Sequence, residues 1–86
     1  MKIIKYCRHA RKRMKERNVT EEEVNFVINK ADYIENDVKD RKNAYKHINE
    51  RFTRVTFKDV TFKEENDNIF IITVNIRKKP FERLNL

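Results

Sequence analysis

The chain has 86 residues, so it forms a single domain with a thin core, and a deep substrate cavity is not expected. Its one cysteine, Cys7, excludes an intramolecular disulfide, and its longest apolar run, residues 69–72, is far too short to span a membrane. The net charge of +7 lies entirely in residues 1–17, which hold eight Lys and Arg residues against Glu16. No signal-peptide pattern is visible, so the sequence predicts a cytoplasmic protein whose basic segment faces a polyanion, RNA being the best candidate.

A first helix is predicted over residues 6–17. At about 100° per residue its apolar side chains fall on one arc, which we expect to pack on the core. The side chains on the opposite side are basic, and we expect them to contact nucleic acid. They are Arg8, Arg11, Lys12 and Lys15. The alternative is a solvated basic helix that has no partner.

A second helix is predicted after a sharp turn at Asn18, where a left-handed residue belongs. Thr20 and Glu23 form a capping box at its start, and apolar residues then recur at helical spacing to about Lys30. The two helices are therefore predicted to form an N-terminal helical hairpin. Because the chain contains no glycine, its turns must be made by Asn, Asp or Lys.

After residue 32 the pattern changes to strand alternation. In one segment the apolar residues alternate at Val55 and Phe57 and then change phase at Val60, which predicts a bulge or a turn near residues 58–59. The expected strands cover residues 33–38, 44–49, 52–63 and 69–77, with polar turns at 40–43 and 64–68.

Residues 69–77 form the most strand-like segment and are placed centrally in the sheet, because they begin apolar on both faces. Strict alternation puts Ile71 and Val74 on opposite faces. Residues 78–86 are expected to be a C-terminal tail of the single domain 1–86. The predicted fold class is α+β, with the helical hairpin on one face of an antiparallel sheet of three to five strands and the other face partly open.

One stretch resembles a known family. It reads His9-Ala10-Arg-Lys-Arg13-Met14-Lys-Glu-Arg17-Asn18-Val19, followed by Thr20-Glu-Glu-Glu-Val24. A small uncharacterised bacterial and archaeal family carries His-Ala-x-x-Arg-Met-x-x-Arg-Gly-Ile and ends in a Val-Thr-Val strand, which Ile72-Thr73-Val74 matches. Asn18 replaces the usual glycine, and residues 43–58 differ in length. The resemblance covers most of residues 6–76 and groups the chain with the RelE/ParE/BrnT-like toxins of toxin–antitoxin systems.

The resemblance implies a RelE-like toxin fold, which in many relatives cleaves mRNA without a metal and in others acts on DNA gyrase. It also implies ribosome-associated mRNA as the target and an acidic antitoxin as a partner. We therefore expect a toxin-like, metal-independent endoribonuclease. The alternative is a non-catalytic nucleic-acid- or protein-binding module with the same fold. Neither a metal nor another cofactor is expected, and the sequence does not fix the oligomeric state.

Metal-free RNA cleavage needs a base for the 2′-hydroxyl, an acid for the leaving oxygen and cations for the phosphate. His9 and Arg13 lie at the edge of the apolar arc, one helical turn apart, and are predicted to be catalytic together with His47. Alternatively, His9 and Arg13 tie the helix to the sheet, with Thr73 and Asn75 as their partners, and His47 is simply exposed. Further cations predicted to bind nucleic acid are Arg17, Arg54, Arg77 and Lys78.

Overall fold

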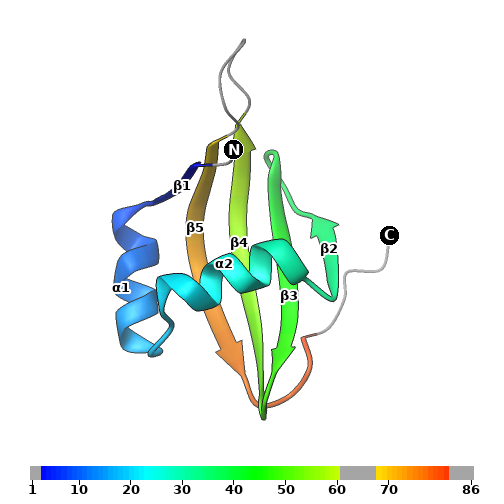
Figure 1. Ribbon diagram of the computed structural model, residues 1–86. Coiled ribbons are helices and arrows are strands. Elements are labelled where there is room, and N and C mark those ends of the chain that lie inside the picture. The colour runs from blue at the N-terminus through cyan, green and yellow to red at the C-terminus, as the bar shows by residue number, and fades with distance from the viewer. Residues whose placement is uncertain (1–2, 61–67, 82–86) are drawn as a thin grey trace.

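The computed structural model describes residues 3–60 and 68–81. In this part of the chain five strands form one mixed sheet, in the order β1-β5-β4-β3-β2 (Figure 1). The strand β1 runs parallel to β5, and every other neighbouring pair is antiparallel. The elements are β1 (Ile3–Tyr6), α1 (Arg8–Glu16), α2 (Glu21–Lys30), β2 (Tyr33–Asn36), β3 (Arg41–Ile48), β4 (Arg51–Val60) and β5 (Asn68–Arg77).

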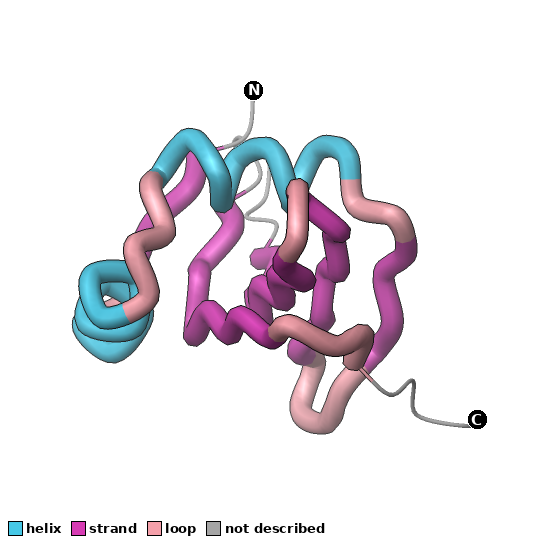
Figure 2. The backbone as a smooth tube through the Cα atoms, turned by 90° about the horizontal axis from the view of Figure 1, so that it is seen from below, coloured by secondary structure: helices cyan, strands magenta, loops and turns pink. Residues whose placement is uncertain are grey.

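The predicted N-terminal helical hairpin on an antiparallel sheet is wrong. A strand, β1, precedes α1 and makes the sheet mixed. The helices pack on the sheet and not chiefly on each other, because α1 lies along β5 while α2 crosses β3 and β4. Figures 1 and 2 show α2 lying across one face of the sheet and α1 standing beside β5. An apolar arc shows that a helix buries one side, but it does not show which element covers that side.

Cys7 sets the start of α1, which begins at Arg8 and not at residue 6. The Sγ of Cys7 accepts a hydrogen bond from the backbone N–H of Ala10 at 3.4 Å and donates one to the carbonyl of Ile72 at 3.2 Å. Its backbone N–H also donates to the carbonyl of Ile71 at 3.2 Å. The thiol is therefore an exposed helix cap that joins α1 to β5.

The turn chemistry and the second helix are confirmed. Thr20 is the N-cap of α2 and its Oγ1 accepts from the backbone N–H of Glu23 at 3.1 Å, and the helix ends at Lys30. In the described ranges the non-glycine residues with positive φ are only of the three expected types. They are Asn18, Lys39, Asp40 and Asn49. Asn and Asp, which occupy three of these four positions, are the non-glycine residues that tolerate the left-handed region best.

The four expected strands are present with shifted bounds, and β4, not β5, is the middle strand. The register shifts between Thr56 and Phe57 of β4: Thr56 pairs with Thr73, but Phe57 pairs with Ile71. Ile72 of β5 is therefore left without a partner on β4. The bulge therefore reverses the alternation within β5, and strict alternation there is wrong. Residues 61–63 of the expected third strand, 64–67 of the expected loop and 82–86 of the expected tail lie outside the described residues.

One apolar cluster holds the sheet to both helices. Val24 and Val27 of α2 are fully buried, as are Val55 and Val74 on the strands beneath them. Burying such side chains stabilises the fold by about 1.5–3 kcal/mol each. The full cluster is Ala10, Met14, Val19, Val24, Val27, Ala44, Val55, Phe57, Ile69, Ile71 and Val74. Within the described ranges neither helix has the length and apolar character that crossing a membrane requires.

Candidate functional site

The sheet face opposite α2 carries polar and aromatic side chains. Because Ala44, Val55 and Val74 point into the core, their neighbours along each strand point the other way. The register then places these neighbours in rows across the strands. We call this surface the open face; its residues are Tyr33, Glu35, Asn43, Tyr45, His47, Phe52, Arg54, Thr56, Thr73, Asn75 and Arg77.

Tyr45 lies at the centre of the open face and is only 5% exposed. Its ring stacks on that of Tyr33, with centroids 4.4 Å apart and planes at 13°. Its hydroxyl donates a hydrogen bond to Oε1 of Glu35. Burial raises the pKa of Tyr45 to about 12, helped by the Glu35 carboxylate and opposed by the cation of Arg54. Tyr45 therefore keeps its proton at neutral pH and acts as a hydrogen-bond donor, not as a base.

Arg54 and Arg77 both lie close to the same aromatic ring. The ring belongs to Phe81, which follows the end of β5. Its centroid lies 4.9 Å from the Arg54 guanidinium carbon and 5.3 Å from that of Arg77. The ring of Tyr45 meets it edge-on at 5.6 Å. The Nε of Arg54 is buried and has no hydrogen-bond partner among the described residues, so the centre of the open face contains an unused donor.

His47 lies beside this cluster on β3. Its ring stacks on Phe52 at 4.2 Å with planes at 7°, and its side chain is exposed. Asp32 fixes the local backbone, because it accepts from the N–H of His47 and from Nζ of Lys46, both at 2.9 Å. These hydrogen bonds, the backbone one first, lower the pKa of the Asp32 carboxyl. A hollow of about 100 Å³ opens here, lined in part by Tyr33, Tyr45, His47, Phe52 and Phe81.

Polar contacts link successive turns of α1. Nε of Arg13 donates to Nε2 of His9 at 3.4 Å, and an Arg13 nitrogen lies 3.2 Å from Oε1 of Glu16. The same carboxylate lies 3.7 Å from Arg17. His9 is exposed, and in the part of the chain that the structure describes the side-chain hydrogen bonds of His9 and Arg13 stay within α1. The structure thus does not show the predicted tie to the sheet.

The predicted site residues fall into two groups. Arg54, Arg77, His47, Thr73 and Asn75 share the open face. The basic residues of α1 stand beside β5, and β4 separates β5 from the strand that carries His47. His9 and Arg13 are therefore not brought together with His47. The group on α1 comprises Arg8, His9, Arg11, Lys12, Arg13, Lys15 and Arg17, and Lys78 lies exposed just after β5.

Sequence reasoning missed Glu35 and Phe81. The two-residue spacing of Tyr33 and Glu35 on β2 was the available signal for Glu35, since it places both on one face. Phe81 follows Pro80 in a segment assigned to the tail, and nothing in its local pattern indicates that it returns to the sheet.

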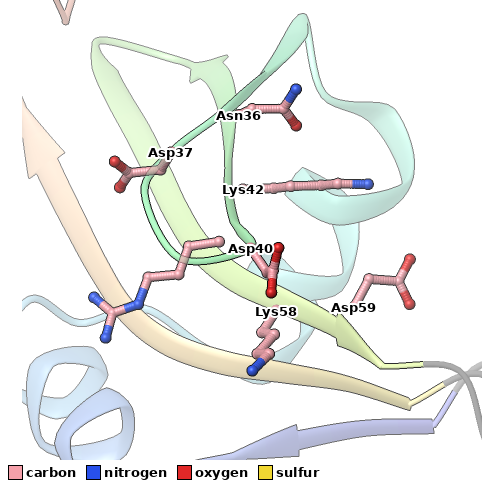
Figure 3. A pocket seen from close by; sticks show the side chains of 7 residues that line it. Asn36, Asp37, Asp40, Lys42, Lys58 and Asp59 are labelled. Carbon is pink, nitrogen blue, oxygen red and sulfur yellow. The ribbon is translucent and has the colours of Figure 1, made fainter.

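A larger hollow of about 600 Å³ lies at the end of the β2–β3 hairpin. Figure 3 shows its side chains pointing in different directions and not converging on one point. Asp37 is already bonded to the N–H of Val38 at 2.7 Å and to the amide of Asn43 at 3.4 Å. Within the described ranges no group of three His, Cys, Asp or Glu is placed to hold a metal. The lining is balanced between acids and bases: Asn36, Asp37, Asp40, Arg41, Lys42, Lys58 and Asp59.

A family model matches residues 6–76, which is most of the chain. The chain belongs to the DUF4258 family. That family is described as a domain of unknown function. The chain matches no curated protein and no solved structure. In this DUF4258 chain the matched residues run from the last residue of β1 to the penultimate residue of β5. They include α1 and most of the open face, whereas Arg77 and Phe81 lie beyond them.

Proposed function

We propose that this chain binds single-stranded RNA across the open face and α1, and cleaves it without a metal as the toxin of a toxin–antitoxin pair. The observation that supports this most is the cluster of Arg54 and Arg77 with aromatic rings on the sheet face opposite α2. Unpaired bases stack on aromatic rings and on guanidinium planes, and arginine also binds the phosphates between them.

The charge on α1 supports the same function. Most of its basic side chains are exposed, and the helix itself packs along β5 (Figure 2). A strand that crosses the open face toward β5 would therefore reach this charge next. Exposed cations attract a phosphate backbone by releasing its counterions, whatever the base sequence. In this proposal His9 and Arg13 contact flanking phosphates, and an acidic antitoxin would compete for the same surface.

The open face also offers groups for the chemistry. His47 lies diagonally across the β3–β4 pair from Arg54, a position about 7–8 Å away. In the proposed reaction His47 takes the proton of the 2′-hydroxyl, whose oxygen attacks phosphorus. The bond from phosphorus to the 5′-oxygen breaks, and the protonated His47 or water returns a proton to that oxygen. Arg54 and Arg77 offset the phosphate charge.

The direct test is cleavage in EDTA. Pure protein and a labelled single-stranded RNA should give fragments that end in a 2′,3′-cyclic phosphate. His47→Ala should slow cleavage by about 10²- to 10⁴-fold, because a positioned acid–base group contributes this much. The matched control is His9→Ala, which removes the histidine outside the open face and should change the rate far less. Cleavage that needs Mg²⁺, or an equal loss in both variants, would contradict the proposed reaction.

A non-catalytic RNA-binding module is the second candidate. It is favoured by one observation: among the described residues His47 is the open face's only histidine, and its ring is stacked on Phe52. This candidate expects binding without turnover in the same assay. RNA binding itself is common to both candidates and is tested separately.

Charge reversal on α1 tests the binding surface. Changing Arg8, Arg11, Lys12 and Lys15 to Glu should flatten the plot of log affinity against log salt by about 3, since each phosphate contact to a single strand contributes about 0.7. The measurement is fluorescence anisotropy with labelled RNA over a salt series. The control is Lys30→Glu with Lys39→Glu, two exposed lysines outside both surfaces, which should leave the slope nearly unchanged. An unchanged slope in the α1 variant would remove this helix from the interface.

A further inference from the structure

Phe81 occupies the centre of the open face although it does not belong to the sheet. It is reached through Lys78, Lys79 and Pro80, all three of which are exposed. Its ring is only partly buried and touches two cations and one phenol ring. The chain therefore places a planar side chain, carried on an exposed segment, against two guanidinium groups. We call the space that this ring fills beside Arg54, Arg77 and Tyr45 the slot.

The walls of this slot suit a planar ring that has polar edges. One guanidinium group can stack on an aromatic ring while a second donates in its own plane to acceptors at the ring's edge. Phenylalanine uses only the first of these properties. The buried Nε of Arg54 is left without a partner in the described structure, and the protonated hydroxyl of Tyr45 lies in the same cluster. A ring that carries carbonyl oxygens or ring nitrogens would give the Arg54 donor an acceptor, while the hydroxyl of Tyr45 keeps its hydrogen bond to Glu35.

We infer that the slot filled by Phe81 is a nucleobase subsite, and that Phe81 is an internal occupant which a base of single-stranded RNA displaces. This inference rests on the proposed RNA binding and names one position within it. Arg54 and Arg77 contact the base as they now contact the phenyl ring, and the buried Nε of Arg54 gains a hydrogen-bond acceptor. The competition lowers RNA affinity, because only the fraction of molecules with an empty slot binds fully.

The test compares two phenylalanines in a binding assay. The probe is a short labelled single-stranded RNA with 2′-O-methyl groups, which blocks cleavage. Phe81→Ala should bind it roughly fivefold to thirtyfold more tightly, because two cation–π contacts no longer compete. The matched control is Phe26→Ala, since Phe26 is 46% exposed on α2 and also lies under a lysine, with Nζ of Lys46 5.4 Å from its ring. The control should bind as the unchanged protein does.

The outcomes separate the two claims. If the unchanged protein binds RNA and Phe81→Ala binds it equally or more weakly, the subsite is overturned while the RNA-binding function stands. If the unchanged protein and both variants fail to bind, the proposed function is overturned and the subsite with it. Tighter binding by both phenylalanine variants also overturns the subsite, because the gain would not depend on the slot.

A second measurement needs no RNA and monitors the slot directly. Removing Phe81 uncovers Tyr45, so the pKa of Tyr45 should fall from about 12 toward its ordinary value of 10.0. Ultraviolet titration of tyrosinate reports this change, and Tyr45→Phe identifies which transition belongs to Tyr45. Adding a nucleoside monophosphate to the Phe81→Ala protein should raise the pKa again. An unchanged titration after removal of Phe81, or no response to the nucleotide, would overturn the inference.

Discussion

Arg54→Ala will weaken the binding of single-stranded RNA by roughly thirtyfold or more, and cleavage at low RNA concentration will fall at least as far. The variant removes a stacking surface and a charged donor from the centre of the open face. Stacking of one base is worth about 1–3 kcal/mol, and a hydrogen bond to a charged group about 1.5–3 kcal/mol. The measurement is a direct titration of labelled RNA with 2′-O-methyl groups.

Two further variants make this result specific. Arg54→Lys keeps the charge but loses the planar fork, so it should recover only part of the affinity. Arg41→Ala is the matched control, because Arg41 is exposed at the start of β3 among the carboxylates of the hairpin hollow. It should lose little affinity. Equal losses for Arg41→Ala and Arg54→Ala would mean that only total charge matters and that the open face is not the binding surface.

Glu23→Ala will lower the free energy of unfolding by about 2 kcal/mol. Although Glu23 was expected to act only in a capping box, its carboxylate reaches β4, where it pairs with Arg51 and accepts from Oγ1 of Thr53 at 3.2 Å. The Glu23 side chain is 14% exposed and Thr53 is fully buried. Breaking a buried pair costs about 3–5 kcal/mol, and the cost is smaller here because Arg51 still reaches solvent.

The free energy of unfolding is measured by urea unfolding followed by circular dichroism. In a thermal scan, Tm should fall by about 10 °C for a domain of this size. Glu22→Ala is the control, since Glu22 is the exposed neighbour in the same turn of α2. It should change stability by less than about 0.5 kcal/mol. Glu23→Gln keeps an acceptor for Thr53 and should lie between the two. If Glu22→Ala destabilises as much as Glu23→Ala, the effect comes from the helix dipole and not from the contact with β4.

Local chemistry explains what could be predicted of the fold. The start of α2 and the turn at Asn18 follow from residues within a few positions of one another. Strand β1 did not follow, because its partner is β5, more than 60 residues away, and its four residues run directly into a helical pattern. The position of the bulge was anticipated only approximately, since the phase change in β4 does not show that β5 supplies the extra residue.

The same limit applies to the candidate site. Alternation along β3, β4 and β5 is enough to place His47, Arg54 and Asn75 on one face once the core side is known. It cannot show that α1 stands beside that face, and the predicted grouping of His9 with His47 depended on such a contact. The role of Phe81 depends on how the chain turns after Pro80, which no periodic pattern encodes.

The position of β5 also has a consequence for synthesis on the ribosome. This strand follows every other described element along the chain, yet it joins β1 and α1 to the rest of the sheet. A nascent chain can assemble β2, β3 and β4 by local pairing. The helix α1 packs on β5, so it has no strand to pack on until β5 has left the exit tunnel. The basic helix and the open face are thus aligned only after β5 has emerged, so an RNA-directed activity would begin only then.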